Sequence, residues 1–490
     1  MPKVAPELTL VTVSIDKKAE TPLFQQLYDG IRNEILKGTI RSGQRLPASR
    51  QLADQLGISR NVVTLAFEQL MLEGYLQGKT GSGTFVSSTI PDTHLQPQLI
   101  NEPHAVRKKN LAEFVAPDLL TKNAQNEEII PFQNAVPAFD LFPFKTLSRL
   151  ASRAYKNMSK FHLGYSDAMG YAPLRENIAS YLRTSRGVKC EADQILIVNG
   201  AQQAFSLCSQ VLLKPNDEVV VEDPGYNGAK SAFVSCGARL RPVPVQSDGL
   251  DVEYLDKHGR GAKMVYVTPA HQYPMGGTLS LAKRLELLNW ASEHESWILE
   301  DDYDSELRYT GRPLASLQGL DQHNRVIYIG TFSKVVFPAL RVAYIVLPTR
   351  SMAEQFKYYK AVLDRQFPIM EQIILNSFVE EGYFARHLRK MRIAYDERQK
   401  MLIKAIDKDL FPKLRVQEQA AGMHLLGWLP ESQNDTQISA LLAKNGILVN
   451  ALSEYTMKFR QKPALILGYT AFNKFRIRHY VQRMNGLMKF

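Results

Sequence analysis

The sequence is poor in cysteine and has no long apolar run. Only three of its 490 residues are cysteines, Cys190, Cys208 and Cys236, and their number and spacing exclude a disulfide framework or a cysteine-based metal site. No stretch of about 18 apolar residues is present, which excludes a membrane-spanning helix. The segment 1–20 lacks a basic start followed by an apolar core. We therefore expect no signal peptide, no membrane partner and a cytoplasmic location.

An excess of one charge sign is absent from most of the chain. The formal net charge is +11. Residues 1–90 contain ten Lys and Arg against eight Asp and Glu, whereas residues 351–490 contain 22 against 13. The excess therefore lies at the C-terminal end. A basic excess suggests an anionic partner such as nucleic acid, but a solvated basic surface gives the same count, and both interpretations stay open.

Composition divides the chain into three parts. With 45% apolar and 22% charged residues, it is typical of a soluble protein of several domains. We predict a small helix-rich domain over residues 1–88, a linker over 89–112 with few large apolar residues, and a large domain over 113–490. In the large domain, apolar runs alternate with amphipathic helix patterns, which predicts an α/β fold with a mostly parallel sheet. The clearest runs are 194–198, 217–222, 262–267, 297–300 and 325–330.

The small domain is expected to hold three helices and a hairpin. Apolar residues recur every four positions from Leu23 to Ile35, which predicts the first helix. The second is expected over 49–56, ending at Gly57, and Ser59 is expected to cap the third. A glycine-rich stretch then predicts a β-hairpin. This order is typical of a winged helix-turn-helix, although a three-helix interaction module with solvated charges fits the same spacing.

Four linked motifs decide between these alternatives. They are LPASR at 46–50, GISRN at 57–61, GY at 74–75 and GSGTFV at 81–86. Together they resemble the winged helix-turn-helix of GntR-type bacterial regulators. The resemblance implies binding of double-stranded DNA, with Arg60 and Asn61 of the third helix suited to guanine and adenine in the major groove. The residues expected at DNA are Ser49, Arg50, Ser59, Arg60, Asn61, Thr64, Lys79, Gly81, Gly83 and Thr84.

Three features of the large domain each follow an expected strand. Gly200 opens a helix directly after a strand, and the free amides of such a helix start can hold a phosphate. Tyr226 lies in a turn and can stack on a flat ring. Lys334 lies where the carboxyl end of a parallel sheet places ligands, and can form a Schiff base with an aldehyde cofactor. Each feature alone also fits an ordinary turn, a packed aromatic or a surface lysine.

A fourth feature is acidic. The strand at 297–300 runs directly into carboxylates. One of them, Asp301, can pair with a protonated pyridine nitrogen. A metal site built from Glu300, Asp301, Asp302 and Asp304 is the alternative, but the spacing of a calcium loop is absent. We therefore expect no metal.

In their order along the chain, the phosphate turn, aromatic ring, acid and lysine resemble the fold-type-I aminotransferases, which use pyridoxal 5′-phosphate (PLP). The resemblance covers roughly residues 115–490 and implies a large lobe and a small lobe, the latter mainly 351–490. By position, Lys334 would form the internal aldimine, Asp301 would pair with the pyridine nitrogen, and Tyr303 would bond the phenolic oxygen. The other implied contacts are Tyr226 at the ring, Gly200, Ala201, Gln202, Thr331, Ser333 and Arg341 at the phosphate, and Tyr165 at the phosphate of a partner subunit.

Two departures from that family carry information. Its Asn-Pro-x-Gly segment reads HQYPMG at 271–276, so Tyr273 replaces the Asn and His271 is either a substitute or structural. This version resembles the MocR/GabR group, in which a GntR-type winged helix is fused to an aminotransferase-like domain. The matching strand at 463–469 has no arginine where true aminotransferases clamp the substrate carboxylate. Its absence predicts weak amino-acid transamination, with physiological turnover not expected and partial reactions allowed.

The resemblance favours a PLP-dependent transcriptional regulator. It implies a homodimer, head-to-tail in this group, whose large domain senses PLP or a small amine or amino acid. The first alternative is an active aminotransferase with an accessory DNA-binding domain. The second is an aminotransferase whose N-terminal domain only mediates assembly. If the chain is a regulator, the basic residues of 351–490 are candidates for contacts with DNA phosphates.

Overall fold

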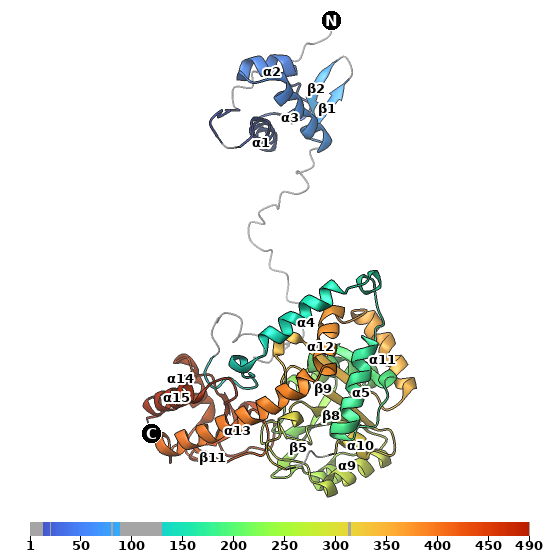
Figure 1. Cartoon of the computed structure of the whole chain (residues 1–490), viewed down its shortest axis with the longest axis vertical. Coiled ribbons are helices and arrows are strands. Elements are labelled where there is room, and N and C mark those ends of the chain that lie inside the picture. Colours follow the sequence, from blue (N-terminus) through green and yellow to red (C-terminus); the bar gives the residue numbers. More distant parts are fainter. Residues whose placement is uncertain (1–12, 20, 80–81, 89–129, 312–314, 490) are drawn as a thin grey trace. The chain divides into compact units, whose positions relative to one another are not determined.

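The computed structural model describes residues 13–19, 21–79, 82–88, 130–311 and 315–489. The chain divides into two compact units, Met1–Phe114 and Val115–Phe490 (Figure 1). The linker expected at 89–112 lies outside the described residues. Among the described residues, no helix is both long enough and apolar enough to cross a membrane.

The first unit holds the three expected helices. They are α1 (Leu23–Leu36), α2 (Ser49–Leu56) and α3 (Arg60–Leu72). Gly57 ends α2 in the left-handed conformation, with φ of 62°, and the Ser59 hydroxyl caps α3 by accepting from the Val62 amide. The buried faces, which include Leu27 and Phe67, form one core. Short turns between helices that share a core give the helix-turn-helix its geometry.

The wing of the first unit is a two-stranded antiparallel hairpin. Strands β1 (Leu76–Lys79) and β2 (Gly83–Val86) pair in register from Leu76 opposite Val86 to Lys79 opposite Gly83. Leu76 and Val86 belong to the helical core, which fixes the hairpin against α3. Gly83 has φ of +109°, a conformation that favours glycine.

The second unit is built on an eight-stranded sheet, in the order β3-β10-β9-β8-β7-β4-β5-β6. Its strands are β3 (Ile195–Asn199), β4 (Glu218–Asp223), β5 (Arg239–Gln246), β6 (Gly249–Leu250), β7 (Met264–Val267), β8 (Trp297–Asp302), β9 (Val326–Thr331) and β10 (Val342–Val346). Strands β5, β4, β7, β8 and β9 run parallel, while β10 is antiparallel to both of its neighbours. The predicted mostly parallel sheet is therefore confirmed, and all five apolar runs are strands in it.

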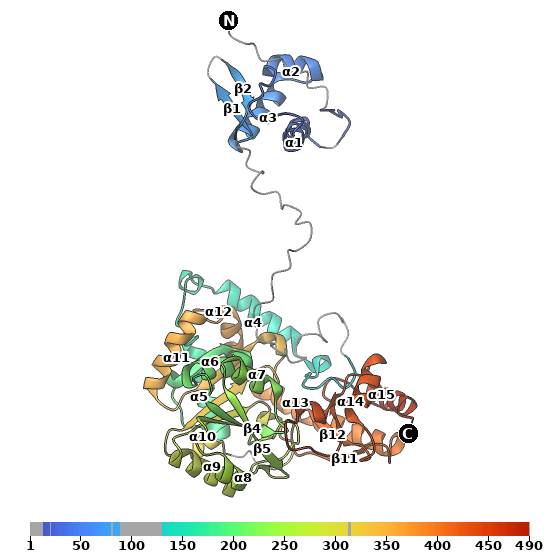
Figure 2. The ribbon, with the colours of Figure 1, turned by 180° about the vertical axis from the view of Figure 1, so that it is seen from behind.

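Helices cover both faces of this sheet, which explains why the centres of strands such as β7 and β10 are apolar on both sides (Figures 1 and 2). Alternate residues of one strand enter different cores: Leu196 packs with α6 and α7, whereas Ile197 faces the opposite side. The helices of the large lobe are α4 (Phe144–Lys156), α5 (Ala172–Arg186), α6 (Gly200–Leu212), α7 (Asn227–Ser235), α8 (Val252–His258), α9 (Leu281–Glu293), α10 (Leu317–Leu320), α11 (Arg350–Leu363) and α12 (Ile369–Glu380).

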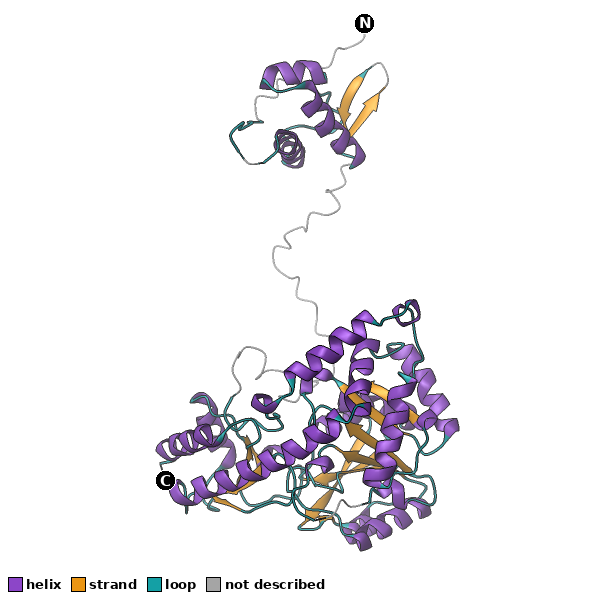
Figure 3. Cartoon of the chain, viewed as in Figure 1, coloured by secondary structure: helices purple, strands orange, loops and turns teal. Residues whose placement is uncertain are grey.

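The small lobe is a four-stranded antiparallel sheet beside three helices (Figure 3). Its sheet has the order β11-β12-β14-β13, and the strands are β11 (Arg415–Val416), β12 (His424–Trp428), β13 (Asn450–Ala451) and β14 (Ala464–Gly468). Its helices are α13 (Tyr383–Asp409), α14 (Asp435–Lys444) and α15 (Lys474–Leu487). Helix α11 packs on α6, and α12 packs on α4 and α5 of the large lobe as well as on α13 of the small lobe.

Candidate cofactor site and nucleic-acid interface

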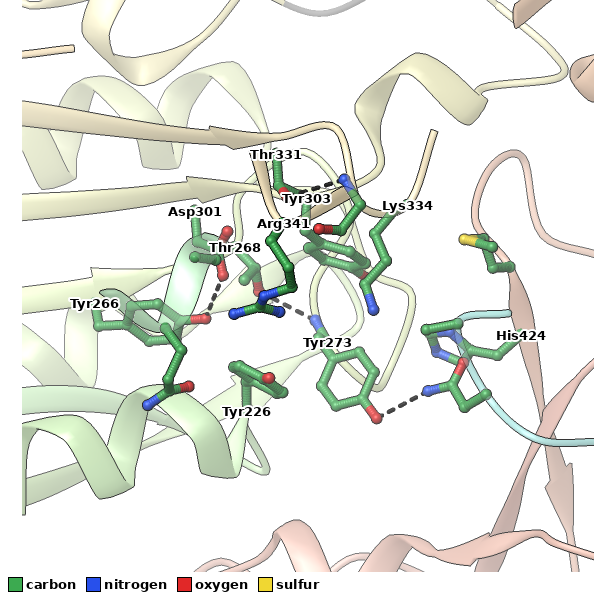
Figure 4. A pocket seen from close by; sticks show the side chains of 16 residues that line it. Tyr226, Tyr266, Thr268, Tyr273, Asp301, Tyr303, Thr331, Lys334, Arg341 and His424 are labelled. Carbon is green, nitrogen blue, oxygen red and sulfur yellow. Dashed lines mark hydrogen bonds between the residues drawn. The ribbon is translucent and has the colours of Figure 1, made fainter. Parts of the chain in front are cut away.

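A cavity of about 170 Å³ lies at the carboxyl ends of the parallel strands β7, β8 and β9. This is the edge at which α/β sheets place ligands. Figure 4 shows Lys334, Arg341, Tyr226 and Tyr273 arranged around one space. The cavity is lined by Asn134, Ala135, Ala201, Gln202, Tyr226, Tyr266, Thr268, Tyr273, Asp301, Tyr303, Thr331, Ser333, Lys334, Arg341, Met423 and His424.

Lys334 contributes an amine to this cavity. It follows β9 by three residues, and the turn between them is fixed because the Ser333 amide donates to the Thr331 hydroxyl at 3.2 Å. Burial lowers the pKa of Lys334, against the opposing effect of the nearby carboxylates, chiefly Asp301. A lowered pKa leaves more of the amine neutral, which is the form that attacks a carbonyl. The site therefore presents a nucleophilic lysine.

Asp301 is the last residue but one of β8, and it has one carboxylate oxygen paired and one available. The Tyr266 hydroxyl donates to its Oδ2 at 2.7 Å, whereas its Oδ1 is buried without a hydrogen-bond partner. Burial raises the pKa of Asp301 to about 7. A cationic ring N–H placed at Oδ1 would remove this penalty, because it supplies both a hydrogen bond and the opposite charge. The carboxyl therefore fits a protonated pyridine nitrogen.

The neighbouring carboxylates do not converge on a metal. The Glu300 carboxylate accepts from two backbone amides at the start of α10. Asp302 pairs with Arg186 at 2.8 Å, and Asp304 lies 2.8 Å from His271 Nδ1. Strand alternation places Glu300 and Asp302 on the face opposite to Asp301, and each of Glu300, Asp302 and Asp304 is already engaged by a different protein group. Within the described ranges, no three His, Cys, Asp or Glu residues form a cluster that could hold a metal ion.

The start of α6 and Arg341 form an anion cradle. Gly200 has φ of +74°, and the Arg341 guanidinium lies over it, donating through Nη2 to the Asn199 carbonyl at 3.1 Å. The first amides of a helix and a guanidinium both bind phosphate well. The Ser333 hydroxyl is buried without a hydrogen-bond partner, so it adds a group suited to a phosphate oxygen. The cradle, the amine and Asp301 together fit PLP.

Gly200→Ala is expected to weaken PLP binding about tenfold. The left-handed conformation of residue 200 costs an alanine about 1–2 kcal/mol. The added Cβ would also lie 2.6 Å from Nη2 of Arg341, displacing the guanidinium from the cradle. Fluorescence titration of cofactor-free protein with PLP measures the change.

The matched control for this substitution is Gly187→Ala. Gly187 has φ of +64° at the end of α5, and a Cβ there meets nothing within 4 Å. It carries similar backbone strain away from the cavity, so PLP affinity should stay at the wild-type value. Equal affinities in both variants would show that Gly200 does not serve the cradle.

Three tyrosines form the aromatic wall of the cavity. The rings of Tyr226 and Tyr273 meet edge to face, with centroids 5.7 Å apart. The Tyr303 hydroxyl lies 3.0 Å from Nδ1 of His271. His271 itself is buried behind Tyr303 and next to Asp304, and it is not among the residues that line the cavity. His271 therefore contacts Tyr303, which lines the cavity, and does not itself line the cavity as a cofactor-binding residue would.

Several lining residues were not anticipated from the sequence. Tyr266 and Thr268 come from β7 and the turn after it; the Thr268 hydroxyl donates to Glu222 at 2.6 Å and accepts from the Tyr273 amide at 3.0 Å. Asn134 donates to the Tyr273 hydroxyl at 2.9 Å. The small lobe adds Met423 and His424. Only the position of Tyr266, on a strand beside that of Asp301, gave a signal that sequence reasoning could have used.

Two further expectations concern the edges of the site. Tyr165 is 80% exposed, lies under the guanidinium of Arg365 and does not line the cavity of its own chain. Strand β14 contains no arginine, as the sequence indicated. Of the arginines that the structure describes, Arg341 alone lines the cavity, and it faces the anion cradle. The described part of the cavity wall therefore offers no second guanidinium for a substrate carboxylate.

Hydrogen bonds clamp the small lobe to the large lobe beside Tyr226. The Asp223 carboxylate accepts from three consecutive backbone amides, those of Met457, Lys458 and Phe459, at 2.7, 2.6 and 2.9 Å. The Lys230 amine and the Gly225 amide both donate to the Tyr455 carbonyl, at 2.7 and 3.1 Å. Asn227 bonds the Glu454 carbonyl at 2.9 Å. We call this set of contacts the interlobe clamp.

The first unit presents the expected polar residues around the start of α3. Arg60 and Asn61 are exposed, and Arg60 Nε lies 3.4 Å from the Ser49 hydroxyl at the start of α2. The Thr64 hydroxyl is half-buried because it bonds the Arg60 carbonyl at 3.0 Å, so it is less free for a base than Arg60 is. Arg50 is exposed. These side chains suit the major groove at the N-terminal end of a recognition helix.

The wing adds basic groups to this unit. Lys79 is exposed and its amine lies over the Phe85 ring, while Thr84 is half-buried. Gly81 lies outside the described residues. Sequence reasoning missed Arg45, whose exposed guanidinium lies at Gly83, where a Cβ would come within 2.9 Å of it. The close approach explains the glycine at position 83 and places a further cation on the wing.

Comparisons with known families match both units. Residues 138–466 match the family described as aminotransferase class I and II, and residues 23–86 match the bacterial regulatory proteins of the gntR family. A probable rhizopine catabolism regulatory protein, MocR, from Rhizobium meliloti is 36% identical over 94% of this chain and 92% of that protein. The pyridoxine biosynthesis regulator PdxR of Corynebacterium glutamicum is 32% identical over 90% of this chain and 91% of its own.

Solved structures similar to the second unit are aminotransferases. The kynurenine aminotransferase of Pyrococcus horikoshii, crystallised with PMP, is 26% identical with a TM-score of 0.68, over 74% of this chain and 93% of that chain. The α-aminoadipate aminotransferase LysN of Thermus thermophilus, complexed with a phosphopyridoxyl-leucine, is 28% identical with a TM-score of 0.68, over 74% and 92%. The fold and these complexes imply PLP binding by this domain.

Proposed function

Because the chain belongs to the aminotransferase class I and II family and carries a gntR-family domain at its N-terminal side, we propose that it is a DNA-binding transcriptional regulator controlled through PLP. The observation that carries this proposal is the cavity, in which an amine, a half-paired carboxyl and an anion cradle meet. A winged helix in the same chain can convert binding in that cavity into a change in DNA binding. The effector is PLP itself or a small amine or amino acid.

The residues divide the work of holding the cofactor. Lys334 would attach it, Asp301 Oδ1 would pair with the ring nitrogen, and Tyr226 would lie against the ring. The start of α6 at Gly200, Ala201 and Gln202, with Thr331, Ser333 and Arg341, receives the phosphate. PLP supplies an electron sink and an aldehyde that reacts with amines. The wall of Tyr273 and Tyr303 excludes water from this aldehyde and from Lys334.

Transamination is the second candidate function, and the cavity argues against it. A substrate carboxylate is recognised best by a bidentate arginine, yet among the described residues the one arginine that lines the cavity, Arg341, belongs to the anion cradle. Binding without turnover is what a sensor requires. The name of the C. glutamicum relative, a pyridoxine biosynthesis regulator, supports the cofactor as one effector, and that of the R. meliloti relative supports a small metabolite.

We also propose that the functional unit is a homodimer, head-to-tail as in the MocR/GabR group. Tyr165 supports this, because its ring is 80% exposed and its own chain's cavity is lined without it. A tyrosine in this position can complete the phosphate site of a second copy. Sharing the site would make cofactor binding and subunit arrangement interdependent.

A single purified preparation can separate regulator from enzyme. Amino acids and amines are added to the PLP-bound chain while its absorbance and keto-acid release are recorded. Binding to an operator, selected from a random library by the wild-type chain, is measured in parallel with and without PLP. A regulator gives a spectral change with little keto acid and an altered affinity for DNA. Rapid keto-acid release with unaltered DNA affinity would assign the chain to the aminotransferases instead.

A further inference from the structure

The basic excess of the chain is concentrated in its last 36 residues. After Glu454 the sequence contains no Asp or Glu, yet it has eight basic residues, Lys458, Arg460, Lys462, Lys474, Arg476, Arg478, Arg483 and Lys489. This segment therefore carries +8 of the total +11. Most protein surfaces mix both signs, so a segment without any acid is unusual. Of its eight basic residues, Lys462 pairs with Glu431, an acid outside the segment, at 2.8 Å.

Helix α15 presents much of this charge on one exposed arc. Its apolar residues Ile477, Val481 and Met484 are buried in the small-lobe core, where α15 packs along α13. The remaining arc carries exposed side chains, those of Lys474, Phe475, Arg476, Arg478, His479, Gln482 and Arg483. Phe475 is 69% exposed, and the Lys474 amine lies over its ring at 5.2 Å. We call this arc the α15 face.

The α15 face fits a polyanion with closely spaced charges. Arginine forks bind phosphate oxygens in pairs, whereas a hydrated lysine surface is less selective. Arg476 is held over the ring of Phe472, with Cζ 5.6 Å from the centroid, which limits the freedom of its guanidinium. By contrast, the exposed basic residues of the neighbouring α13 are interrupted by acids, as in the Lys400–Asp396 pair at 2.7 Å.

The N-terminal unit has little net positive charge of its own for binding DNA phosphates. Affinity for DNA comes largely from cations that neutralise phosphates. Residues 1–90 carry a net charge of only +2, so the reading unit has little excess charge for this purpose. The 41 residues between positions 88 and 130 could span at most roughly 140 Å when extended, so chain length does not prevent both units from meeting one duplex.

We infer that the α15 face is a second DNA-binding surface, which contacts the phosphate backbone without reading sequence. This inference rests on the proposed function, because it assumes that both units bind the same DNA. In this arrangement the winged helix selects the site and the α15 face supplies affinity that depends on salt. The effector-binding unit thereby contacts the DNA directly.

The test is the salt dependence of binding by the full-length, PLP-bound chain. A random-sequence 40-base-pair duplex is titrated at several salt concentrations, and the slope of log K against log salt is compared between variants. Neutralising the α15 face by Lys474→Gln, Arg476→Gln and Arg478→Gln should make the slope shallower by about 2–3 if each residue contacts one phosphate. The matched control is Lys214→Gln, Arg239→Gln and Arg260→Gln, which removes three exposed charges from the large lobe and leaves the α15 face of the small lobe intact. It should leave the slope unchanged.

Each outcome has a distinct meaning. An unchanged slope in the α15 variant, while Arg60→Ala still weakens operator binding, overturns this inference and leaves the regulator intact. An unchanged slope with weakened self-association in sedimentation also overturns it, and assigns the face to a second copy. If the wild-type chain binds no duplex at all, it is the proposed function that fails. Circular dichroism and the bound-cofactor spectrum establish that the α15 variant is folded.

Discussion

Replacing Lys334 by alanine is expected to abolish the long-wavelength absorbance of the bound cofactor. The amine of Lys334 lines the cavity, and burial lowers its pKa toward the reactive neutral form. No other lysine is among the described residues of the cavity wall. Without this amine PLP can be held only through its phosphate and ring, so the spectrum should revert to that of free PLP. Absorbance after gel filtration with excess PLP measures the change.

Lys230 provides a stringent control for this result. Burial lowers its pKa to about 8, and burial likewise lowers the pKa of Lys334. Its amine, however, is bound to the Tyr455 carbonyl in the interlobe clamp and does not line the cavity. Lys230→Met should keep the long-wavelength band. A band that survives in Lys334→Ala and disappears in Lys230→Met would reverse the assignment.

Arg60→Ala is expected to weaken binding to the selected operator by about 1–3 kcal/mol. Arg60 is exposed at the first turn of α3, with its guanidinium beside Ser49 of α2. A bidentate contact to guanine from this position would be lost, and discrimination at that base pair should relax. Fluorescence anisotropy with the operator and with single-base variants measures both effects.

The control within the same unit is Lys37→Ala. Lys37 follows the last residue of α1 and pairs with Glu34 at 3.4 Å, so its loss removes a charge away from the start of α3. Its effect should be uniform across sequences and small. Undiminished specific binding by Arg60→Ala would place the recognition surface elsewhere.

The sequence predicted those site residues that follow strands. Gly200, Tyr226, Asp301 and Lys334 each lie within four residues of the end of an apolar run, and the carboxyl ends of parallel strands converge on one edge of a sheet. Strand alternation also separates Asp301, which faces the cavity, from Asp302, which pairs with Arg186 on the other side. For these residues, local pattern and fold class were sufficient.

The missed residues depend on packing over long sequence distances. Asn134 meets Tyr273 across 139 positions, and Met423 and His424 enter the cavity from the small lobe. Tyr266 was hidden for another reason, because a tyrosine within an apolar strand looks like an ordinary core residue. Only the structure reveals that its hydroxyl turns to the Asp301 carboxyl. Hydrophobic periodicity in the sequence does not indicate contacts between side chains of such distant segments.

The boundary between the two lobes is a further feature that sequence position does not define. The sequence placed the small lobe mainly at 351–490, whereas α11 within that range packs on α6, and α12 packs on α4 and α5 as well as on α13. Phe356 of α11, for example, belongs to the core around Leu196 and Phe205. The boundary between two lobes depends on which helix faces pack together. An amphipathic pattern in the sequence shows that a helix has a buried face, but not which element that face packs against.

The interlobe clamp holds the small lobe against the large lobe at the Tyr226 side of the cavity. Hinging the small lobe away from Tyr226 would break the three amide bonds to Asp223 and the Lys230–Tyr455 bond. Each hydrogen bond to a charged group contributes about 1.5–3 kcal/mol, so spontaneous opening at this edge is rare. An effector should therefore reach the cavity without the two lobes separating at this edge.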